Sequence, residues 1–209
     1  SAASDVYKRQ VQIYTEESNR TILQQLLPEA IVSTYTEYEE EKLQSLLKWA
    51  DVICIGCGLG KSRTAGQILS YLMKYAEVPC VIDADGLNLL ADHMELLPKE
   101  KKPFVLTPHM KEMAGLLGCT IPELGKNRFA ALKEFTDSYG VVCVLKDART
   151  LVAGKDRQMF LNTAGNSAMA KAGSGDVLAG VITGLLAQHM KVYEGTVLGV
   201  YLHALSLIH

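Results

Sequence analysis

The chain has 209 residues, of which 48% are hydrophobic and 21% charged, and its formal net charge is −2. This length and apolar content suffice for a sizeable core, so we expect a soluble globular protein. Because 21 basic residues balance 23 acidic ones without a long block of one sign, a nucleic-acid-binding or polybasic membrane surface is not expected. The longest apolar stretches, 177–190 and 195–209, are shorter than the ~20 residues of a membrane-spanning helix.

The N-terminus and the cysteines both indicate the cytoplasm. The first ten residues contain no apolar segment of the kind that directs export. An odd number of scattered cysteines makes a poor disulfide framework, and four of them lie in apolar runs where Cys serves as a small buried hydrophobe. Cys54 and Cys57 form one CxxC pair, but no second pair follows at the spacing of a zinc site. We therefore do not expect these two cysteines to bind a metal or to act in redox chemistry.

The order of elements predicts an α/β fold, because short β-branched runs alternate with amphipathic stretches from residue 11 onward. The predicted strands are 51–55, 80–83, 104–106, 141–145, 150–153 and 159–161. Several are apolar on both faces, as strands covered by helices on both sides must be. The predicted helices, by apolar spacing, are 19–27, 39–49, 62–75, 111–117, 127–139, 176–189 and 192 onward.

The chain is predicted to form a single domain over residues 11–205, because no linker, composition shift or internal repeat divides it. Residues 1–10 and 206–209 are tails whose membership of the fold is left open. The last predicted helix reaches His209 without a capping residue, so either the tails are foreign to the fold or the chain is a fragment of something longer.

A glycine-rich turn, Gly56-Cys57-Gly58-Leu59-Gly60-Lys61-Ser62, follows the first predicted buried strand and opens a helix, where backbone N–H groups favour an anion. It is neither a P-loop nor a dinucleotide fingerprint, because Ile55 and Lys61 occupy positions where those motifs need Gly. The alternative is a tight turn that binds nothing.

Two further segments place polar residues directly after buried strands, where open α/β sheets bind their ligands. In Val81-Ile82-Asp83-Ala84-Asp85-Gly86-Leu87-Asn88, the alternative is that Asp85 or Asn88 caps the following helix. In Thr107-Pro108-His109-Met110-Lys111-Glu112, His109 and Glu112 lie three residues apart and can face the same crevice. The alternative for Glu112 is an ordinary acidic residue in a first helical turn.

Charged residues in the turn Lys146-Asp147-Ala148-Arg149-Thr150 could reach the phosphates of a nucleotide. A solvated hairpin tip is the equally weighted alternative.

The most informative stretch is Asn162 to Gly180, a loop of small residues that runs through GSGD into an apolar helix. Such a loop directs several unpaired backbone N–H groups toward the same point. Together they can bind the negatively charged oxygens of a phosphoryl group during its transfer. Asp176, in the first turn, is suited to accept a proton from an attacking hydroxyl. The alternative is an ordinary N-cap at Asp176 with Ser174 as a turn residue.

The strings NTAGNSAMAKAGSGDVLAG, TPHMKE, VIDADGLNLL and GCGLG together resemble the NAD(P)H-hydrate dehydratases of the ribokinase-like superfamily, over about residues 11 to 205. The resemblance implies a three-layer α/β/α sandwich with a mostly parallel central sheet. It also implies a hydro-lyase that uses ADP or ATP, with Mg²⁺, to phosphorylate the ring hydroxyl of the S-epimer of hydrated NADH or NADPH. Loss of phosphate then restores the reduced cofactor.

The resemblance also implies roles for particular residues. Asp176 would be the catalytic base and contact the hydrated ring, which Gly60 and His109 would also line. Glu112 would correspond to an acidic residue near magnesium. The implied anion hole is Gly173, Ser174 and Gly175, and the implied nucleotide site is Lys146, Asp147, Ala148, Arg149, Thr150 and Gly175.

The chain departs from the family pattern at Asp147 and Ala168, where Gly is common. No glycine-rich GGS-type turn precedes Val11, so the resemblance implies an incomplete copy of the family's domain. Two other functions stay open: a vitamin-precursor kinase of the same superfamily, and a nucleotide-binding module without catalysis. The expected partners are the small-molecule substrate and a second copy of the chain in a homo-oligomer. An epimerase domain fused upstream is also possible within such a family.

Overall fold

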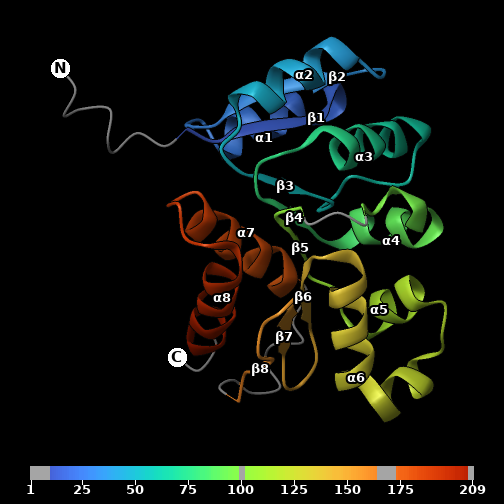
Figure 1. Cartoon of the computed structure of the whole chain (residues 1–209). Coiled ribbons are helices and arrows are strands. Elements are labelled where there is room, and N and C mark those ends of the chain that lie inside the picture. Colours follow the sequence, from blue (N-terminus) through green and yellow to red (C-terminus); the bar gives the residue numbers. More distant parts are fainter. Residues whose placement is uncertain (1–9, 99–101, 164–172, 207–209) are drawn as a thin grey trace. The chain divides into compact units, whose positions relative to one another are not determined.

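The structure, a computed structural model, describes residues 10–98, 102–163 and 173–206 and divides into two compact units, residues 1–43 and 44–209 (Figure 1). The predicted single domain over 11–205 stays a prediction beside this division. Of the predicted tails, residues 1–9 and 207–209 lie outside the described part of the chain.

The first unit is built on a parallel pair of strands, β1 (Gln12–Glu16) and β2 (Ile31–Tyr35), which sequence analysis did not predict. Their register runs from Gln12 opposite Ile31 to Glu16 opposite Tyr35. A short 3-10 helix, η2 (Glu17–Asn19), and the predicted α1 (Arg20–Leu26) connect them.

The second unit contains a six-stranded sheet in the order β3-β4-β5-β6-β7-β8. The strands are β3 (Ile53–Ile55), β4 (Cys80–Ile82), β5 (Phe104–Leu106), β6 (Val142–Leu145), β7 (Leu151–Gly154) and β8 (Phe160–Leu161). The first four are parallel, and β7 and β8 are antiparallel additions at one edge. All six predicted strands of this sheet are present, so the predicted mostly parallel sheet is confirmed.

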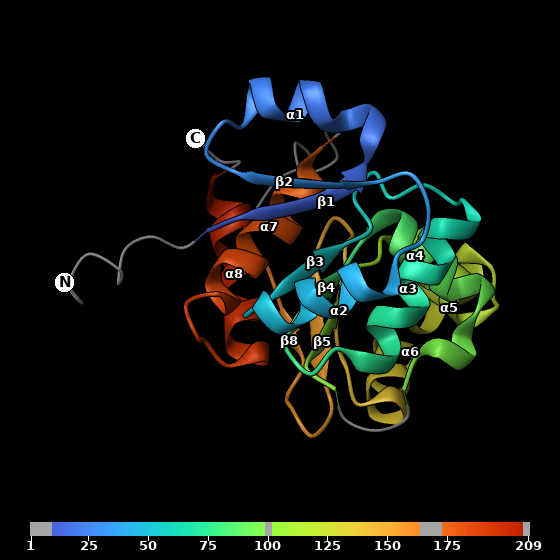
Figure 2. The ribbon, with the colours of Figure 1, turned by 90° about the horizontal axis from the view of Figure 1, so that it is seen from above.

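Helices cover both faces of this sheet, which confirms the three-layer α/β/α sandwich. Figures 1 and 2 show α7 and α8 on one side and α3 to α6 on the other. The helix bounds are α2 (Glu40–Trp49), α3 (Arg63–Tyr75), α4 (Ala84–Asp92), α5 (Met110–Leu117), α6 (Ile121–Tyr139), α7 (Ser174–Leu186) and α8 (Val192–Ser206), with a 3-10 turn η3 (Met94–Leu96). No helix among the residues described is long and apolar enough to cross a membrane.

Two stretches of helix were not predicted. The whole of α4 is one, and the first turns of α6 are the other, since the prediction began at Asn127. Pro122 lies in the first turn of α6, where its missing N–H costs no hydrogen bond, and the chain kinks at Asn127, whose φ is −140° and ψ 33°.

The core between the sheet and α7 explains why the strands are apolar on both faces. Valines from four neighbouring strands pack against α7 and α8 in one cluster that comprises Val81, Val105, Val144, Val152, Leu178, Ala179, Ile182, Leu186 and Val200. The alternate strand residues, such as Phe104 and Leu106, are also fully buried, on the opposite face. The sheet therefore fixes the position of α7, whose N-terminus forms part of the site described below.

Candidate active site

The glycine-rich turn after β3 is hydrogen-bonded to the acidic turn after β4. The amide of Asp83 donates to the carbonyl of Ile55 at 3.0 Å, and the amide of Asp85 donates to the carbonyl of Gly56 at 3.2 Å. The carboxylate of Asp85 accepts the amide of Gly60 at 2.9 Å. The alternative helix-capping role for Asp85 is therefore not what the structure shows: its carboxylate holds the neighbouring turn.

Gly56 is required by this contact. Its φ is +122°, and a Cβ there would lie 1.7 Å from the carbonyl oxygen of Asp83. Gly60 has a φ of +73° with open space around it, so it lies exposed at the predicted substrate site. Asn88 does not cap α4 either, because its side-chain amide donates to the carbonyl of Ala84 at 3.2 Å.

The turns after β5 and β6 continue the same edge of the sheet. The amide of Thr107 donates to the carbonyl of Ile82 at 3.1 Å, and the amide of Lys146 donates to the carbonyl of Pro108 at 2.8 Å. Four of the sequence motifs are thus brought together in strand order at the carboxyl ends of the parallel strands, as expected for ligand sites of α/β sheets.

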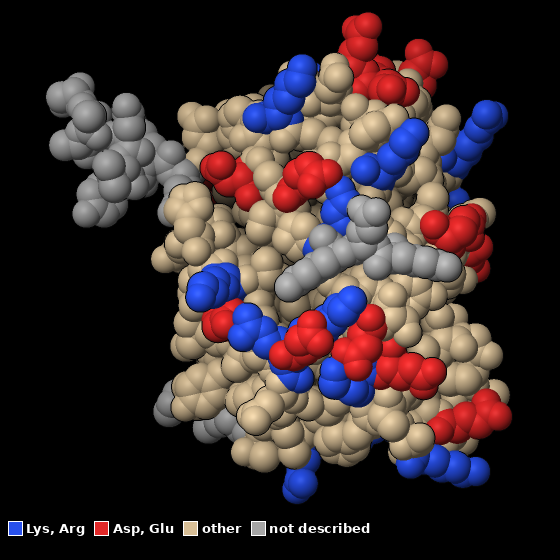
Figure 3. Space-filling view, viewed as in Figure 1, with Lys and Arg blue, Asp and Glu red and all other residues tan. Residues whose placement is uncertain are grey.

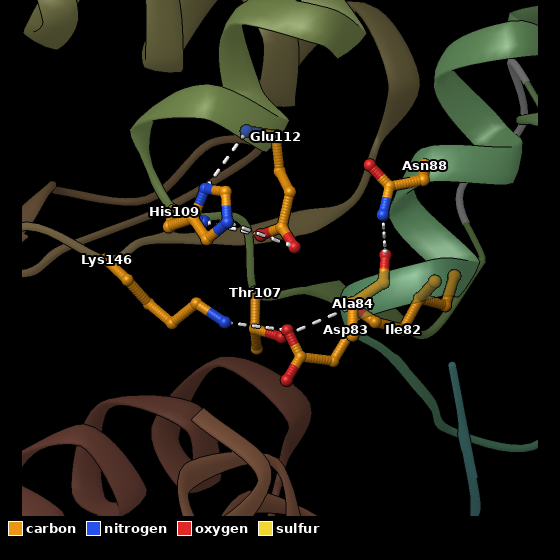
Figure 4. Close-up of polar contacts among 8 residues, drawn as sticks. All are labelled: Ile82, Asp83, Ala84, Asn88, Thr107, His109, Glu112 and Lys146. Atoms are coloured by element: carbon orange, nitrogen blue, oxygen red, sulfur yellow. Dashed lines mark hydrogen bonds and ion pairs between the residues drawn. The ribbon is translucent and has the colours of Figure 1, made fainter. Parts of the chain in front are cut away.

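His109 and Glu112 form a capping box at the start of α5 (Figure 4). The Nδ1 of His109 accepts the amide of Glu112 at 3.1 Å, and Oε2 of Glu112 accepts the amide of His109 at 2.8 Å. The side chain of His109 is 50% exposed and that of Glu112 only 8%. His109 can therefore meet a ligand, whereas the carboxylate of Glu112 is engaged in holding the helix start.

Lys146 points back into the protein rather than toward solvent (Figure 4). Its Nζ donates to Oδ1 of Asp83 at 2.7 Å, and the two side chains are 20% and 2% exposed. Asp83 belongs to the motif that follows β4, but it was not predicted as a site residue. The signal was an ionisable residue directly after a strand that is apolar on both faces.

The turn from Lys146 to Thr150 joins β6 to β7 as a hairpin. Asp147 accepts a hydrogen bond from Arg128 of α6 at 2.5 Å and from the amide of Ala148 at 2.8 Å. Arg128 therefore offsets the extra charge at this position, a partner that the sequence did not indicate. Ala148 and Arg149 are exposed, whereas Thr150 is buried.

The first turn of α7 lies over the Lys146–Asp83 pair. Gly173, in the left-handed region with a φ of +83°, precedes the helix. A Cβ on Gly175 would lie 3.2 Å from Nζ of Lys146 and 3.7 Å from Oδ2 of Asp83. Asp176 is exposed. Residues 164–172 of the predicted anion loop, Ala168 among them, lie outside the described residues.

The buried imidazole of His203 from α8 supports this turn. Its Nε2 lies 3.2 Å from Oγ of Ser174, and the residue is 4% exposed. Burial lowers the pKa of His203 from its ordinary value of 6.5. The ring is therefore neutral at pH 7 and can share a hydrogen bond with the hydroxyl of Ser174.

Cys57 is the second site residue that sequence analysis missed. Its sulfur, a carboxylate oxygen of Asp83 and one of Asp176 all lie within 4.8 Å of one another. Hydrogen bonding with Cys54 and burial raise the pKa of the Cys57 thiol. The expectation that cysteines in apolar runs are buried holds for Cys80 and Cys143 and is wrong for Cys54, which is exposed in the middle of β3.

Figure 3 shows basic and acidic side chains interspersed on the face it presents. That face carries no field of a single sign, as the balanced composition predicted.

Comparison with known proteins gives a consistent result. A family model described as NAD(P)H-hydrate dehydratase matches residues 1–207. The ADP-dependent (S)-NAD(P)H-hydrate dehydratase of Neisseria meningitidis is 40% identical over 185 residues, which are 86% of this chain and 62% of that protein. A bifunctional NAD(P)H-hydrate repair enzyme of Moorella thermoacetica is 38% identical over 182 residues, 87% of this chain and 34% of that one. The chain thus spans less than two thirds of the length of these curated relatives.

Solved structures show the same fold. A ribokinase-like superfamily protein of Enterococcus faecalis superposes with a TM-score of 0.83 at 33% identity, covering 94% of this chain and 67% of that one. An ADP/ATP-dependent NAD(P)H-hydrate dehydratase of Bacillus subtilis, co-crystallised with ATP and Mg²⁺, superposes with a TM-score of 0.74 at 29% identity, covering 94% and 70%. The sequence motifs, the sheet and the family match agree, and the chain belongs to the NAD(P)H-hydrate dehydratase family.

Proposed function

We propose that this protein catalyses the ADP- or ATP-dependent dehydration of the S-epimer of hydrated NADH or NADPH, and so restores the reduced cofactor. Membership of the family and the activity for which its relatives are named supply the reaction class, a hydro-lyase. The observation that carries the proposal is the first turn of α7. There the exposed Asp176 follows Gly175, whose added Cβ would lie 3.2 Å from Nζ of Lys146 and 3.7 Å from Oδ2 of Asp83.

The chemistry begins with transfer of a phosphoryl group. The hydroxyl oxygen on the damaged ring forms a bond to the terminal phosphorus of the nucleotide, and the bond from that phosphorus to the leaving nucleotide oxygen breaks. Asp176 accepts the hydroxyl proton. The phosphate then departs with the carbon–oxygen electron pair, and loss of a proton from the neighbouring carbon restores the double bond.

The backbone at the start of α7 supplies the anion hole. Because the amide of Val177 donates to the carbonyl of Gly173 at 3.2 Å, the preceding amides have no partner within the helix. The predicted anion hole, Gly173, Ser174 and Gly175, includes two of those amides, which stabilise the charge that develops on the transferring group. A side chain at position 175 would crowd Lys146, so glycine keeps the approach open.

The remaining family-implied residues take roles that fit their exposure. Gly60 and His109 line the hydrated-dinucleotide site, where both are exposed. The turn from Lys146 to Thr150, together with Gly175, holds the nucleotide. Lys146 acts there while paired with Asp83, and the exposed Ala148 and Arg149 are the parts of the turn that a nucleotide can reach directly.

The described part of this sheet edge offers few carboxylate oxygens that could bind Mg²⁺. Mg²⁺ takes oxygen ligands and is usually held by one or two carboxylates together with phosphate oxygens. The family-implied Glu112 would be one such carboxylate, and it must release the amide of His109 to offer its oxygen to the ion. When bound with the nucleotide, the ion would neutralise charge on the transferring phosphates.

The wider setting is inferred from the relatives. Several are named bifunctional repair enzymes, which supports a fused or separate epimerase that supplies the S-epimer. From the sequence we also expect the protein to act in the cytoplasm and as a homo-oligomer.

The test is product analysis with hydrated NADH and either nucleotide. The proposal expects recovery of the near-ultraviolet absorbance of reduced nicotinamide, with one orthophosphate released for each cofactor restored. A stable phosphate ester without recovery of absorbance would identify a small-molecule kinase instead. Tight nucleotide binding with neither product would identify a non-catalytic binding module.

A further inference from the structure

Three donor groups from separate parts of the second unit converge beside the first turn of α7. Cys57 comes from the glycine-rich turn, Asp83 from the end of β4 and Asp176 from α7, and one donor atom of each lies within 4.8 Å of the other two. None of these contacts follows from neighbouring positions in the sequence. The spacing of the CxxC pair gave no reason to expect a metal site. The two carboxylates that lie near Cys57 come from distant elements, which spacing in the sequence does not reveal.

The three donors are held in different ways. Oδ1 of Asp83 accepts from Lys146 at 2.7 Å, and the side chain is 2% exposed, so this carboxylate is fixed in place. Its Oδ2 faces the first turn of α7, 3.7 Å from where a Cβ of Gly175 would be. Cys57 and Asp176 are exposed and can approach a ligand from solvent.

Charge and chemistry favour a cation that accepts sulfur. Two carboxylates against one lysine leave a net negative charge, and a coordinated thiol gives up its proton to the metal. Mg²⁺ and Ca²⁺ prefer oxygen ligands, whereas Zn²⁺ binds thiolate, carboxylate and imidazole. Zinc ligands about 2.0 to 2.3 Å from the ion lie roughly 3.3 to 3.8 Å from one another in a tetrahedral site. Shifts on the order of 1 Å would therefore bring these donors into place.

We propose that Cys57, Asp83 and Asp176 form a binding site for a thiophilic divalent cation such as Zn²⁺, with the fourth position open to water. The hydrogen bond from Lys146 to Oδ1 of Asp83 orients the buried ligand, as supporting contacts do at metal sites. Cys54 contacts Cys57 but is not one of the three converging donors.

Bound zinc occupies the carboxylate that the proposed reaction needs as a base. Zinc therefore inhibits the enzyme, and this consequence alone rests on the proposed function. The metal site itself is tested without turnover.

The direct test is titration of the protein with Co²⁺ alone, under a reductant that contains no thiol. Tetrahedral cobalt bound to a thiolate gives a charge-transfer band and intense visible bands, and Zn²⁺ added afterwards should abolish them. The proposal expects one cobalt per chain. Replacing Cys57 with Ser should weaken binding by about 10- to 100-fold or more, since even supporting contacts at metal sites carry that much affinity.

Matched serine variants decide which thiol binds. Cys54→Ser should keep the cobalt spectrum, and so should Cys119→Ser, a partly buried thiol between α5 and α6 that serves as the control. Asp176→Asn should lose it. The absence of a thiolate band in the unaltered protein, or a band that survives in Cys57→Ser, would overturn the proposal. Equal loss in Cys54→Ser would replace the three-donor site with a dithiol site.

Zinc inhibition is measured separately, as the ratio of turnover with and without Zn²⁺ in each variant at saturating Mg²⁺. Cys57→Ser should need at least about tenfold more zinc for the same inhibition, in proportion to its weaker binding. If the protein does not act on hydrated NADH at all, the cobalt spectrum still decides the metal site. The two proposals therefore fail in distinguishable ways.

Discussion

Replacing Lys146 with Met removes the partner of a nearly completely buried carboxylate. The Asp83 side chain is 2% exposed and that of Lys146 20%, with 2.7 Å between Nζ and Oδ1. Breaking such a pair from one side costs about 3–5 kcal/mol, because the remaining charge is left unpaired and largely without water. Since the lysine end is one-fifth exposed, water can reach the gap, and we expect a loss near the lower limit, about 3 kcal/mol.

Urea denaturation and thermal melting measure this loss. For a chain of this size, about 3 kcal/mol corresponds to a decrease in Tm of roughly 6–12 °C. The control is Lys155→Met, at an exposed position in the β7–β8 connection, which should change stability by less than about 0.5 kcal/mol.

A double variant separates the unpaired charge from simple loss of packing. Asp83→Asn combined with Lys146→Met removes both charges, and we expect it to be more stable than Lys146→Met alone. If the free energy of unfolding of Lys146→Met lies within about 1 kcal/mol of that of the unaltered protein, the reasoning is refuted. Leaving the buried Asp83 carboxylate unpaired should cost more than that.

Three further predictions concern packing and protonation. Gly56→Ala should leave little folded protein in circular dichroism and expression tests, because the added Cβ meets the carbonyl oxygen of Asp83 at 1.7 Å; normal folding would show that the turn can move away. Gly199→Ala should cost about 1–3 kcal/mol in urea, because its Cβ meets Ile182 at 2.7 Å; an unchanged midpoint would mean that α7 and α8 pack more loosely. Because burial lowers the pKa of His203, the folded protein binds fewer protons than the unfolded chain just below pH 6.5, so stability falls as the pH drops through the lowered value. His203→Gln should reduce that fall, and an identical pH profile would remove the histidine from the explanation.

Much of the second unit could be predicted from the sequence because its strands are apolar on both faces and are followed by polar turns. Where local propensity and tertiary packing disagreed, the prediction was incomplete. Gly86 lowers the helix propensity of α4, yet a side chain there would approach Ile82 at 3.0 Å and the Cα of Gly56 at 3.3 Å. Packing thus requires the glycine inside α4, a helix for which apolar spacing predicted no range.

The strands of the first unit were missed for a different reason. Gln12–Glu16 and Ile31–Tyr35 mix polar and apolar side chains, and most of their residues are partly exposed. Neither is a continuous apolar run, and each has few residues over which to establish alternation.

The sequence predicted the separate motifs of the site, but it did not predict which side chains form ion pairs with one another there. Glycine-rich and acidic turns after strands point to one edge of an α/β sheet. The partner of Lys146 is 63 positions away in the sequence, and that of Asp147 is 19 away. Such pairs depend on strand order and helix placement, which composition and spacing do not determine. The same holds for Cys57, whose neighbours come from two other elements.

The central claim is that Asp176 accepts a proton beside amides that hold the phosphoryl group. Turnover of hydrated NADH and nucleotide affinity, measured side by side in Asp176→Asn, test it most directly. We predict that turnover falls by about 10²- to 10⁴-fold, the contribution typical of a general base, while nucleotide affinity stays within about threefold. Undiminished turnover in Asp176→Asn would contradict the account.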